Sequence, residues 1–132
     1  MSSHKSVGGG GKKWEAYKTG VKGVYFRMLT VPKVALAIDV QYKDDEIREL
    51  IFDQFTELGR LLAAEWGEEP LFEKNTLYGS GETISRISVT LEGAYFFDQN
   101  QWPDIMNWYQ QKLIGLDSFW DTVGDIVKEL AR

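Results

Sequence analysis

Cysteine is absent from the 132 residues of this sequence, and histidine occurs once. The lack of cysteine excludes a disulfide framework, a thiolate zinc site and a cysteine nucleophile, and it fits a reducing compartment. The single histidine, His4, lies in a glycine-rich N-terminal segment outside any predicted helix or strand. We therefore expect no Ser–His or Cys–His pair and no histidine-based metal site.

Long apolar segments are also missing. No run approaches the roughly 18–20 residues that a membrane-spanning helix requires. The first residues, MSSHKSVGGGG, lack the apolar core of a secretory signal. The expected location is therefore the cytoplasm.

Basic residues are fewer than acidic ones and are concentrated at one end of the chain. The formal net charge is −5. Residues 1–33 hold seven Lys and Arg against one Glu, a balance of +6, which leaves −11 for the other 99 residues. The acidic majority argues against broad nucleic-acid affinity of the whole domain.

Apolar and aromatic residues, in contrast, are plentiful. They make up 43% and 14% of the chain, and charged residues make up 27%. These values are typical of a globular protein with a real core, and the length fits one domain.

The run SVGGGGKKW resembles a phosphate-binding loop at first sight. A Walker-type loop requires a glycine five positions before its Gly-Lys pair and Ser or Thr after it, but the chain has Ser6 and Lys13 there. Four consecutive glycines lose much backbone entropy on ordering, which favours a flexible connector. We predict a flexible leader over residues 1–13 and a single domain over residues 14–132.

Two hairpins and two helical regions are predicted in the domain. The β-branched and aromatic segments Val24–Val31 and Lys33–Tyr42 indicate a hairpin that turns at Pro32. Residues 70–78 and Thr83–Glu92 indicate a second hairpin, with a turn at residues 79–81.

Apolar residues at helical spacing predict one helix from Ile47 to Trp66, ended by Gly67 and capped at its start by the acidic residues 44–46. A second helical stripe runs from Ile105 to Leu130, with Asn100 as the expected N-cap. This stripe fits one long helix or two helices with a break at residues 115–117. The order ββαββα predicts an α+β fold, with an antiparallel sheet of about four strands against two or three helices.

Three charged residues interrupt the predicted strands, namely Arg27, Asp39 and Arg86. Arg27 and Asp39 belong to adjacent strands, so they could form an ion pair across the hairpin, or the charges could face solvent. The alternative is a polar ligand site on the sheet, in which an arginine receives an anion.

The segment KKWEAYKTGVKG, which follows the glycine run, combines aromatic and basic residues in a pattern that suits single-stranded nucleic acid, where rings stack on bases and lysines neutralise phosphates. The candidate contacts are Lys12, Lys13, Trp14, Tyr17, Lys18 and Lys22. Alternatively, the two aromatic residues anchor the leader on the core while the lysines stay solvated.

Carboxylates are the remaining candidates for catalysis. Residues 44–46 form one acidic group, and Glu65, Glu68 and Glu69 form another. Helix capping accounts for the first group and solvent exposure for the second. A restriction-type nuclease needs Asp/Glu-x-Lys, yet no lysine here has an acidic residue two positions before it. We therefore expect no catalytic residues, no metal and no cofactor.

Three segments together are similar to a known family, namely YKTGVKGVYFRM (Tyr17–Met28), SRISVTLEG (Ser85–Gly93) and QWPDIMNWY (Gln101–Tyr109). They resemble the bacterial domain-of-unknown-function family DUF4268 from about Trp14 to the C-terminus. The resemblance implies a small bacterial protein or a module that occurs behind a nuclease-like domain, and it implies no catalytic residues. Stand-alone relatives have one more aromatic-rich helix before this segment. In this chain residues 1–3 fall about where that helix would end, so we expect the family's N-terminal helix to be missing. The resemblance therefore implies an apolar groove left exposed beside the sheet or the C-terminal helix.

These observations lead to the expectation of a non-enzymatic binding or accessory domain whose partner is a protein or a small ligand. A nucleic-acid-associated role is the first alternative, based on the leader and on the family context. A carboxylate- and metal-dependent enzyme is the second, and it would require a clustered acidic pocket.

Overall fold

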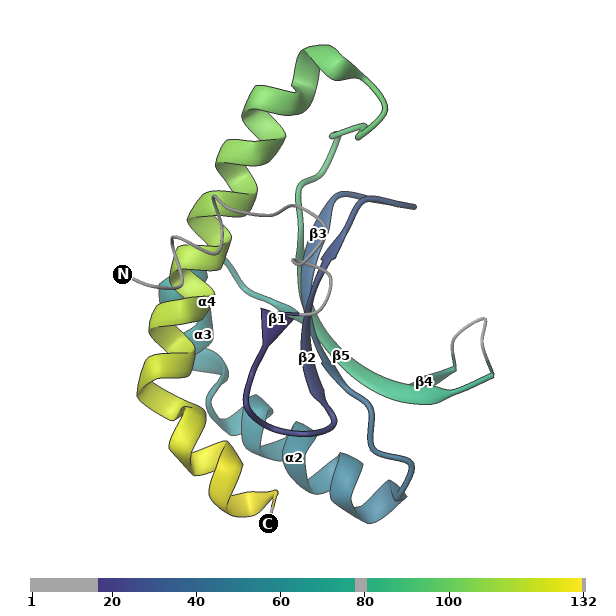
Figure 1. The fold of residues 1–132 in the computed structure, drawn as a ribbon, viewed down its shortest axis with the longest axis vertical. Helices are drawn as coiled ribbons and strands as arrows, with labels where there is room; N and C mark the ends of the chain where they lie inside the picture. Colours follow the sequence, from purple (N-terminus) through teal and green to yellow (C-terminus); the bar gives the residue numbers. More distant parts are fainter. Residues whose placement is uncertain (1–16, 78–80, 132) are drawn as a thin grey trace.

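The computed structural model describes residues 17–77 and 81–131 (Figure 1). Its elements, in chain order, are β1 (Tyr17–Lys18), β2 (Val24–Leu29), β3 (Ala35–Val40), α2 (Asp45–Glu57), α3 (Gly59–Trp66), β4 (Leu71–Leu77), β5 (Thr83–Thr90), the 3-10 helix η2 (Gln99–Gln101) and α4 (Trp102–Leu130).

The strands form one antiparallel sheet in the order β1-β2-β3-β5-β4. All three described α-helices lie on the same side of this sheet, with α4 running along its whole height (Figure 1). The predicted α+β fold is therefore confirmed. The two-residue strand β1 adds to the four predicted strands at one edge.

The two faces of the sheet follow from the alternation of side chains along the strands. Apolar residues of β2, β3 and β5, such as Phe26, Ile38 and Ile87, point to the helices and are almost fully buried. Residues of opposite parity, among them Arg27, Asp39 and Arg86, lie on the other face. No described helix covers this second face, which we call the open face (Figure 1), although Ala37 and Ser88 at its centre are buried.

The first helical region is divided into two helices, which corrects the prediction of one helix. Leu58, with φ −87° and ψ 6°, ends α2 and precedes α3. The break falls beside Gly59, whose low helix propensity weakens this position. A Cβ at Gly59 would lie 3.1 Å from the ring of Phe72, so glycine lets the chain pass close to β4. The predicted C-terminal stop is confirmed, because Gly67 adopts the left-handed conformation with φ 75°.

The C-terminal helical region is a single helix of 29 residues, which decides between the two alternatives. The expected N-cap at Asn100 is wrong. Asp98 instead caps η2 by accepting a hydrogen bond from the Asn100 N–H at 3.0 Å, and α4 begins at Trp102. The cap lies further upstream because this 3-10 turn precedes the α-helix and already occupies residue 100.

Helices α3 and α4 are joined by reciprocal hydrogen bonds. The Trp66 indole donates to the Lys112 carbonyl oxygen at 3.0 Å, and the Lys112 ammonium donates to the Trp66 carbonyl oxygen. None of the described helices is long and apolar enough to cross a membrane.

Candidate ligand-binding site on the open face of the sheet

The three charged residues singled out in the strands meet on the open face. In the strand register, Asp39 of the central strand β3 lies opposite Arg86 of β5. On its other side, Asp39 lies opposite Tyr25 of β2. Arg27 follows Tyr25 two residues later in the same strand. Residues two apart in a strand share a face, so both arginines reach the same carboxylate.

Asp39 is bound by both guanidinium groups. Arg86 forms a two-pronged contact, with Nε 2.6 Å from Oδ1 and one terminal nitrogen 2.8 Å from Oδ2. Arg27 places its Nε 3.2 Å from Oδ2. Of the alternatives that the sequence left open for Arg27 and Asp39, the ion pair is the one observed, and Arg86 is a second partner that the hairpin argument did not include.

Burial differs strongly among the three side chains. Asp39 is 1% exposed and Arg86 is 16% exposed, whereas Arg27 is 34% exposed. Arg27 also lies over the ring of Tyr25, with its guanidinium carbon 5.4 Å from the ring centroid. We call Arg27, Asp39 and Arg86 the charged triad. It carries two positive charges and one negative charge, and Glu73 of β4 lies opposite Arg86 in the register.

A cavity adjoins the charged triad at the end of β3. Its volume is about 330 Å³, and it is lined by Gln41, Tyr42, Lys43, Asp45, Arg48, Glu82 and Thr83. Gln41 connects the two features, since its side-chain amide lies 3.5 Å from Oδ2 of Asp39. The charged lining of the cavity consists of two cations and two carboxylates.

Arg48 of α2 is the buried cation of this cavity, with its side chain 4% exposed. It donates to the Tyr42 carbonyl oxygen at 2.8 Å, to Asp45 at 2.5 Å and to the Asn75 side-chain oxygen at 2.9 Å. A buried guanidinium requires such a full set of acceptors. These bonds hold the start of α2 against the β3–α2 connection and β4.

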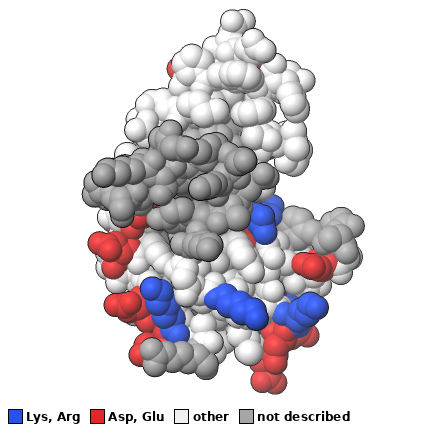
Figure 2. Space-filling view, viewed as in Figure 1, with Lys and Arg blue, Asp and Glu red and all other residues white. Residues whose placement is uncertain are grey.

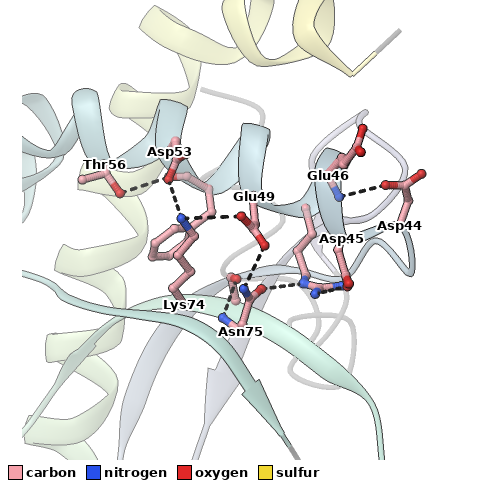
Figure 3. A network of polar contacts seen from close by, with 11 residues as sticks. Asp44, Asp45, Glu46, Glu49, Asp53, Thr56, Lys74 and Asn75 are labelled. Carbon is pink, nitrogen blue, oxygen red and sulfur yellow. Dashed lines mark hydrogen bonds and ion pairs between the residues drawn. The ribbon is translucent and has the colours of Figure 1, made fainter.

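The polar network continues from Asn75 along one side of α2 (Figure 3). The Asn75 amide donates to Glu49 at 3.2 Å, and Lys74 donates to Asp53 at 3.2 Å. Asn75 has φ 53°, a left-handed conformation that asparagine tolerates better than most residues, at the irregularity between Glu73 and Thr76 in β4. The irregularity directs the Asn75 side chain toward α2.

Tyr42, at the wall of the cavity, carries a buried hydroxyl with no hydrogen-bond partner in the described part of the chain. Burial raises the pKa of Tyr42 above its ordinary value of 10.0, and the neighbouring Tyr25 adds to the rise. The hydroxyl therefore stays protonated near neutral pH, where it can donate a hydrogen bond.

The acidic groups of the sequence are separated in space. Asp44 caps α2 as predicted, with Oδ1 accepting from the backbone N–H of Glu46 at 2.8 Å (Figure 3). In the second group, Glu65 accepts from Ser118 at 2.8 Å, and Glu68 pairs with Lys112 at 2.8 Å. Within residues 17–77 and 81–131, no three His, Asp or Glu side chains are placed to hold a metal ion.

The side chains of most candidate nucleic-acid contacts lie outside the part of the chain that the structure describes. Lys12, Lys13 and Trp14 lie outside the described residues, as does the whole predicted leader. Tyr17 and Lys18 form β1, but their side chains are not described. Lys22 is exposed in the turn between β1 and β2.

Sequence reasoning missed the residues that build the cavity. Arg48 and Gln41 have no distinctive sequence context, because an arginine on an amphipathic helix and a glutamine after a strand are ordinary surface residues. The spacing of Asp45 and Arg48, three residues apart on a helix, was the one available signal of an ion pair.

A comparison with protein families matches residues 1–123 to the family described as "Domain of unknown function (DUF4268)". No curated protein matches the chain significantly, and no solved structure does either. The match spans the whole sheet, the cavity and most of α4.

Proposed function

The chain belongs to the DUF4268 family, whose description names no activity, and we propose that it is a binding module for a ligand with an anionic group. The group, a carboxylate or a phosphate, is held on the open face of the sheet at Arg27 and Arg86. Asp39 positions the two arginines and does not itself react.

The observation that carries this proposal is the pairing of two guanidinium groups with one buried carboxylate. Asp39 fixes the orientation of both arginines through contacts of 2.6 to 3.2 Å. Guanidinium groups bind carboxylates and phosphates with matched planar geometry, and prior positioning lowers the entropy lost on binding. Arg27 is the more exposed of the two arginines.

The adjoining cavity provides room for the rest of such a ligand. A volume of about 330 Å³ lies at the lower end of the range for small-molecule sites. Lys43 adds another cation to the lining of the cavity, and Asp45 and Glu82 add two carboxylates. The combination favours a small polar ligand of mixed charge rather than an apolar one.

Recognition rather than catalysis fits the chemistry of the triad. The Asp39 carboxylate is buried and is held by two guanidinium groups, so it is engaged in structural contacts and is not presented to a ligand. A general base must lie within hydrogen-bond reach of the proton that it takes from a substrate.

The proposal is tested by titrating the ¹⁵N-labelled chain with phosphate, citrate and glutamate while following backbone amide shifts. We expect saturable shifts on β2, β3 and β5 in the native chain. Arg27→Gln should weaken binding by about tenfold, since a charge-assisted hydrogen bond contributes about 1.5–3 kcal/mol. Arg60→Gln, at an exposed arginine of α3, is the matched control and should change nothing.

Arg27 is the better test position because Arg86 makes the two-pronged contact with the buried Asp39. Loss of Arg86 would confuse a folding defect with a binding defect. The proposal is wrong if the anions bind the Arg27→Gln protein as tightly as the native chain, or if their amide shifts avoid the open face.

A nucleic-acid-associated role is a second proposal, supported by the basic and aromatic composition of residues 12–22 and by the exposure of Lys22.

A further inference from the structure

The end of the molecule where the chain passes from β5 into α4 exposes four large apolar side chains. Tyr95 is 61% exposed, Phe97 62%, Trp102 41% and Met106 47%. We call these four residues the aromatic tip. Figure 1 shows that this end of α4, in green, projects beyond the sheet and the other helices. Tyr95 and Phe97 belong to the connection before α4, and Trp102 and Met106 belong to its first two turns.

Ring contacts and hydrogen bonds hold the aromatic tip in one arrangement. Tyr95 and Phe97 pack edge to face with centroids 5.6 Å apart, and Trp102 stacks on Phe96 at 5.9 Å. The Trp102 indole donates to the Phe96 carbonyl oxygen at 2.6 Å, and the Tyr95 N–H donates to the Gln101 side-chain oxygen at 2.9 Å. The rings are therefore ordered by local bonds although they contact little of the core.

Among the described residues, the stretch of chain that forms the aromatic tip carries acidic groups and no Lys or Arg. Residues 93–111 include Asp98 and Asp104 but no Lys or Arg. Of the basic residues nearest in the chain, Lys33 pairs with Glu92 at 3.1 Å and Lys112 pairs with Glu68 at 2.8 Å. Figure 2 shows no Lys or Arg at this end of the visible face, whereas several lie at the opposite end.

The size of the aromatic tip fits a short partner segment. Large aromatic side chains bury about 150–250 Å² each, so four half-exposed side chains offer on the order of 400 Å². An exposed apolar patch of this size on a monomer is often functional. It is smaller than one side of a standard interface between two folded proteins, which is about 800 Å².

Charge decides which partner suits this surface. At the described residues 93–111, a nucleic acid or an anionic membrane would meet two aspartates and no cation. A second copy of this chain would bring the same aspartates and a net charge of −5. A segment with an apolar face and flanking Lys or Arg matches both the rings and the acidic rim.

We infer that the aromatic tip is a docking surface for an apolar helical segment of another protein that is flanked by basic residues. The aromatic side chains supply the anchors, and Asp98 and Asp104 set the charge preference. This surface is separate from the charged triad, and the two sites are tested independently.

The experiment selects peptides of about four helical turns from a random mRNA-display library on the full chain. We expect enriched peptides with apolar residues at helical spacing and Lys or Arg on both sides. The affinity of a synthetic peptide from the enriched set should fall by about tenfold or more in the double variant Tyr95→Ser/Phe97→Ser. It should also fall with rising salt.

Two controls accompany this measurement. The double variant Leu71→Ser/Leu77→Ser removes apolar side chains of β4 that are 59% and 70% exposed, and it should leave peptide affinity unchanged. Arg27→Gln should also leave it unchanged, which separates this inference from the anion site. Circular dichroism confirms that each variant is folded.

Several outcomes would overturn the inference. These are the absence of enriched peptides, enrichment of peptides without basic flanks, and equal affinity for the tip variant and the native chain. Sedimentation velocity that reveals a dimer of the native chain, lost in Tyr95→Ser/Phe97→Ser, would assign the surface to a second copy. Co-sedimentation with phosphatidylserine vesicles that depends on the same residues would assign it to a membrane.

Discussion

Asp39 shows at the scale of a single residue how a buried charge organises a surface. Its carboxylate is 1% exposed and lies within 3.2 Å of two guanidinium groups. A buried carboxylate without such partners would cost several kcal/mol. The arginines therefore stabilise Asp39, and Asp39 in turn fixes the positions at which they could meet an anion.

Tyr109 on α4 is a second buried polar residue with a measurable consequence. It is 2% exposed, and its hydroxyl donates to the Leu29 carbonyl oxygen. Burial raises the pKa of Tyr109 from 10.0 to about 12, and a backbone hydrogen bond at Ala35 opposes this shift. Because the folded pKa is the higher one, the contribution of Tyr109 to stability is complete below pH 10.0 and is lost as the pH rises through about 12.

We therefore predict a pH-dependent effect of Tyr109→Phe. Below pH 10 the variant should be less stable than the native chain by about 1 kcal/mol, because it lacks one hydrogen bond. The difference should narrow as the pH rises further, since only the native chain carries this ionisable group. Urea denaturation of both proteins at a series of pH values measures the difference. If the difference in unfolding free energy between the two proteins stays constant up to pH 12, the raised pKa of Tyr109 does not contribute to stability.

At the scale of the elements, the contact between α3 and α4 depends on one glycine. A Cβ at Gly115 would lie 2.6 Å from the carbonyl oxygen of Glu65. This distance is too short for any side chain, so α4 can approach the backbone of α3 only with glycine at this position. The hydrogen bonds between Trp66 and Lys112 lie beside this close approach.

We predict that Gly115→Ala destabilises the protein by about 1–3 kcal/mol, the usual cost of overpacking. Alanine is the better helix former by about 1 kcal/mol, so a loss of stability would identify the interhelical contact as its cause. The midpoint and slope of urea unfolding measure the change.

Gly124→Ala in the same helix is the matched control. Its Cβ would lie 3.2 Å from the ring of Trp120, a side chain that can shift, whereas Gly115 faces backbone. We expect a change within about 1 kcal/mol. Equal losses at the two glycines would contradict the special role of the α3–α4 contact.

At the scale of the whole molecule, the division of charge separates the two proposed functions. The net charge is −5, with +6 in residues 1–33 and −11 in the remainder. Nucleic-acid affinity depends on the number of phosphates neutralised by Lys and Arg and falls with salt. The excess of positive charge that such contacts require lies in residues 1–33.

If the chain is the anion-binding module proposed above, labelled single-stranded DNA and RNA should show little change in fluorescence anisotropy at low or moderate salt. The quadruple variant Lys12/Lys13/Lys18/Lys22→Glu is the control, and tryptophan fluorescence confirms that both proteins are folded. Binding that weakens with salt and disappears in the variant would instead support the nucleic-acid proposal and place the site in the leader.

The elements themselves were largely predictable from sequence. Alternation of apolar residues located β2, β3 and β5, and helical spacing located α2, α3 and α4, because each pattern reflects which side chains of one element face the core. The Asp44 cap and the Gly67 stop were predictable because they involve only neighbouring residues. The break between α2 and α3 at Leu58 and the cap at Asp98 were not predictable, because a short local pattern does not resolve helix boundaries.

The sequence by itself determined the fold class, the capping of α2 and the presence of charged residues within strands, since these depend on local periodicity and residue chemistry. Only the tertiary structure decided that Arg86 joins Arg27 at Asp39, that Arg48 and Gln41 border one cavity, and that the rings of the aromatic tip gather at one end of α4. These groupings bring together residues from different elements, such as Asp39 and Arg86, which are 47 positions apart. Strand order and helix packing create them, and no local pattern encodes which elements become neighbours.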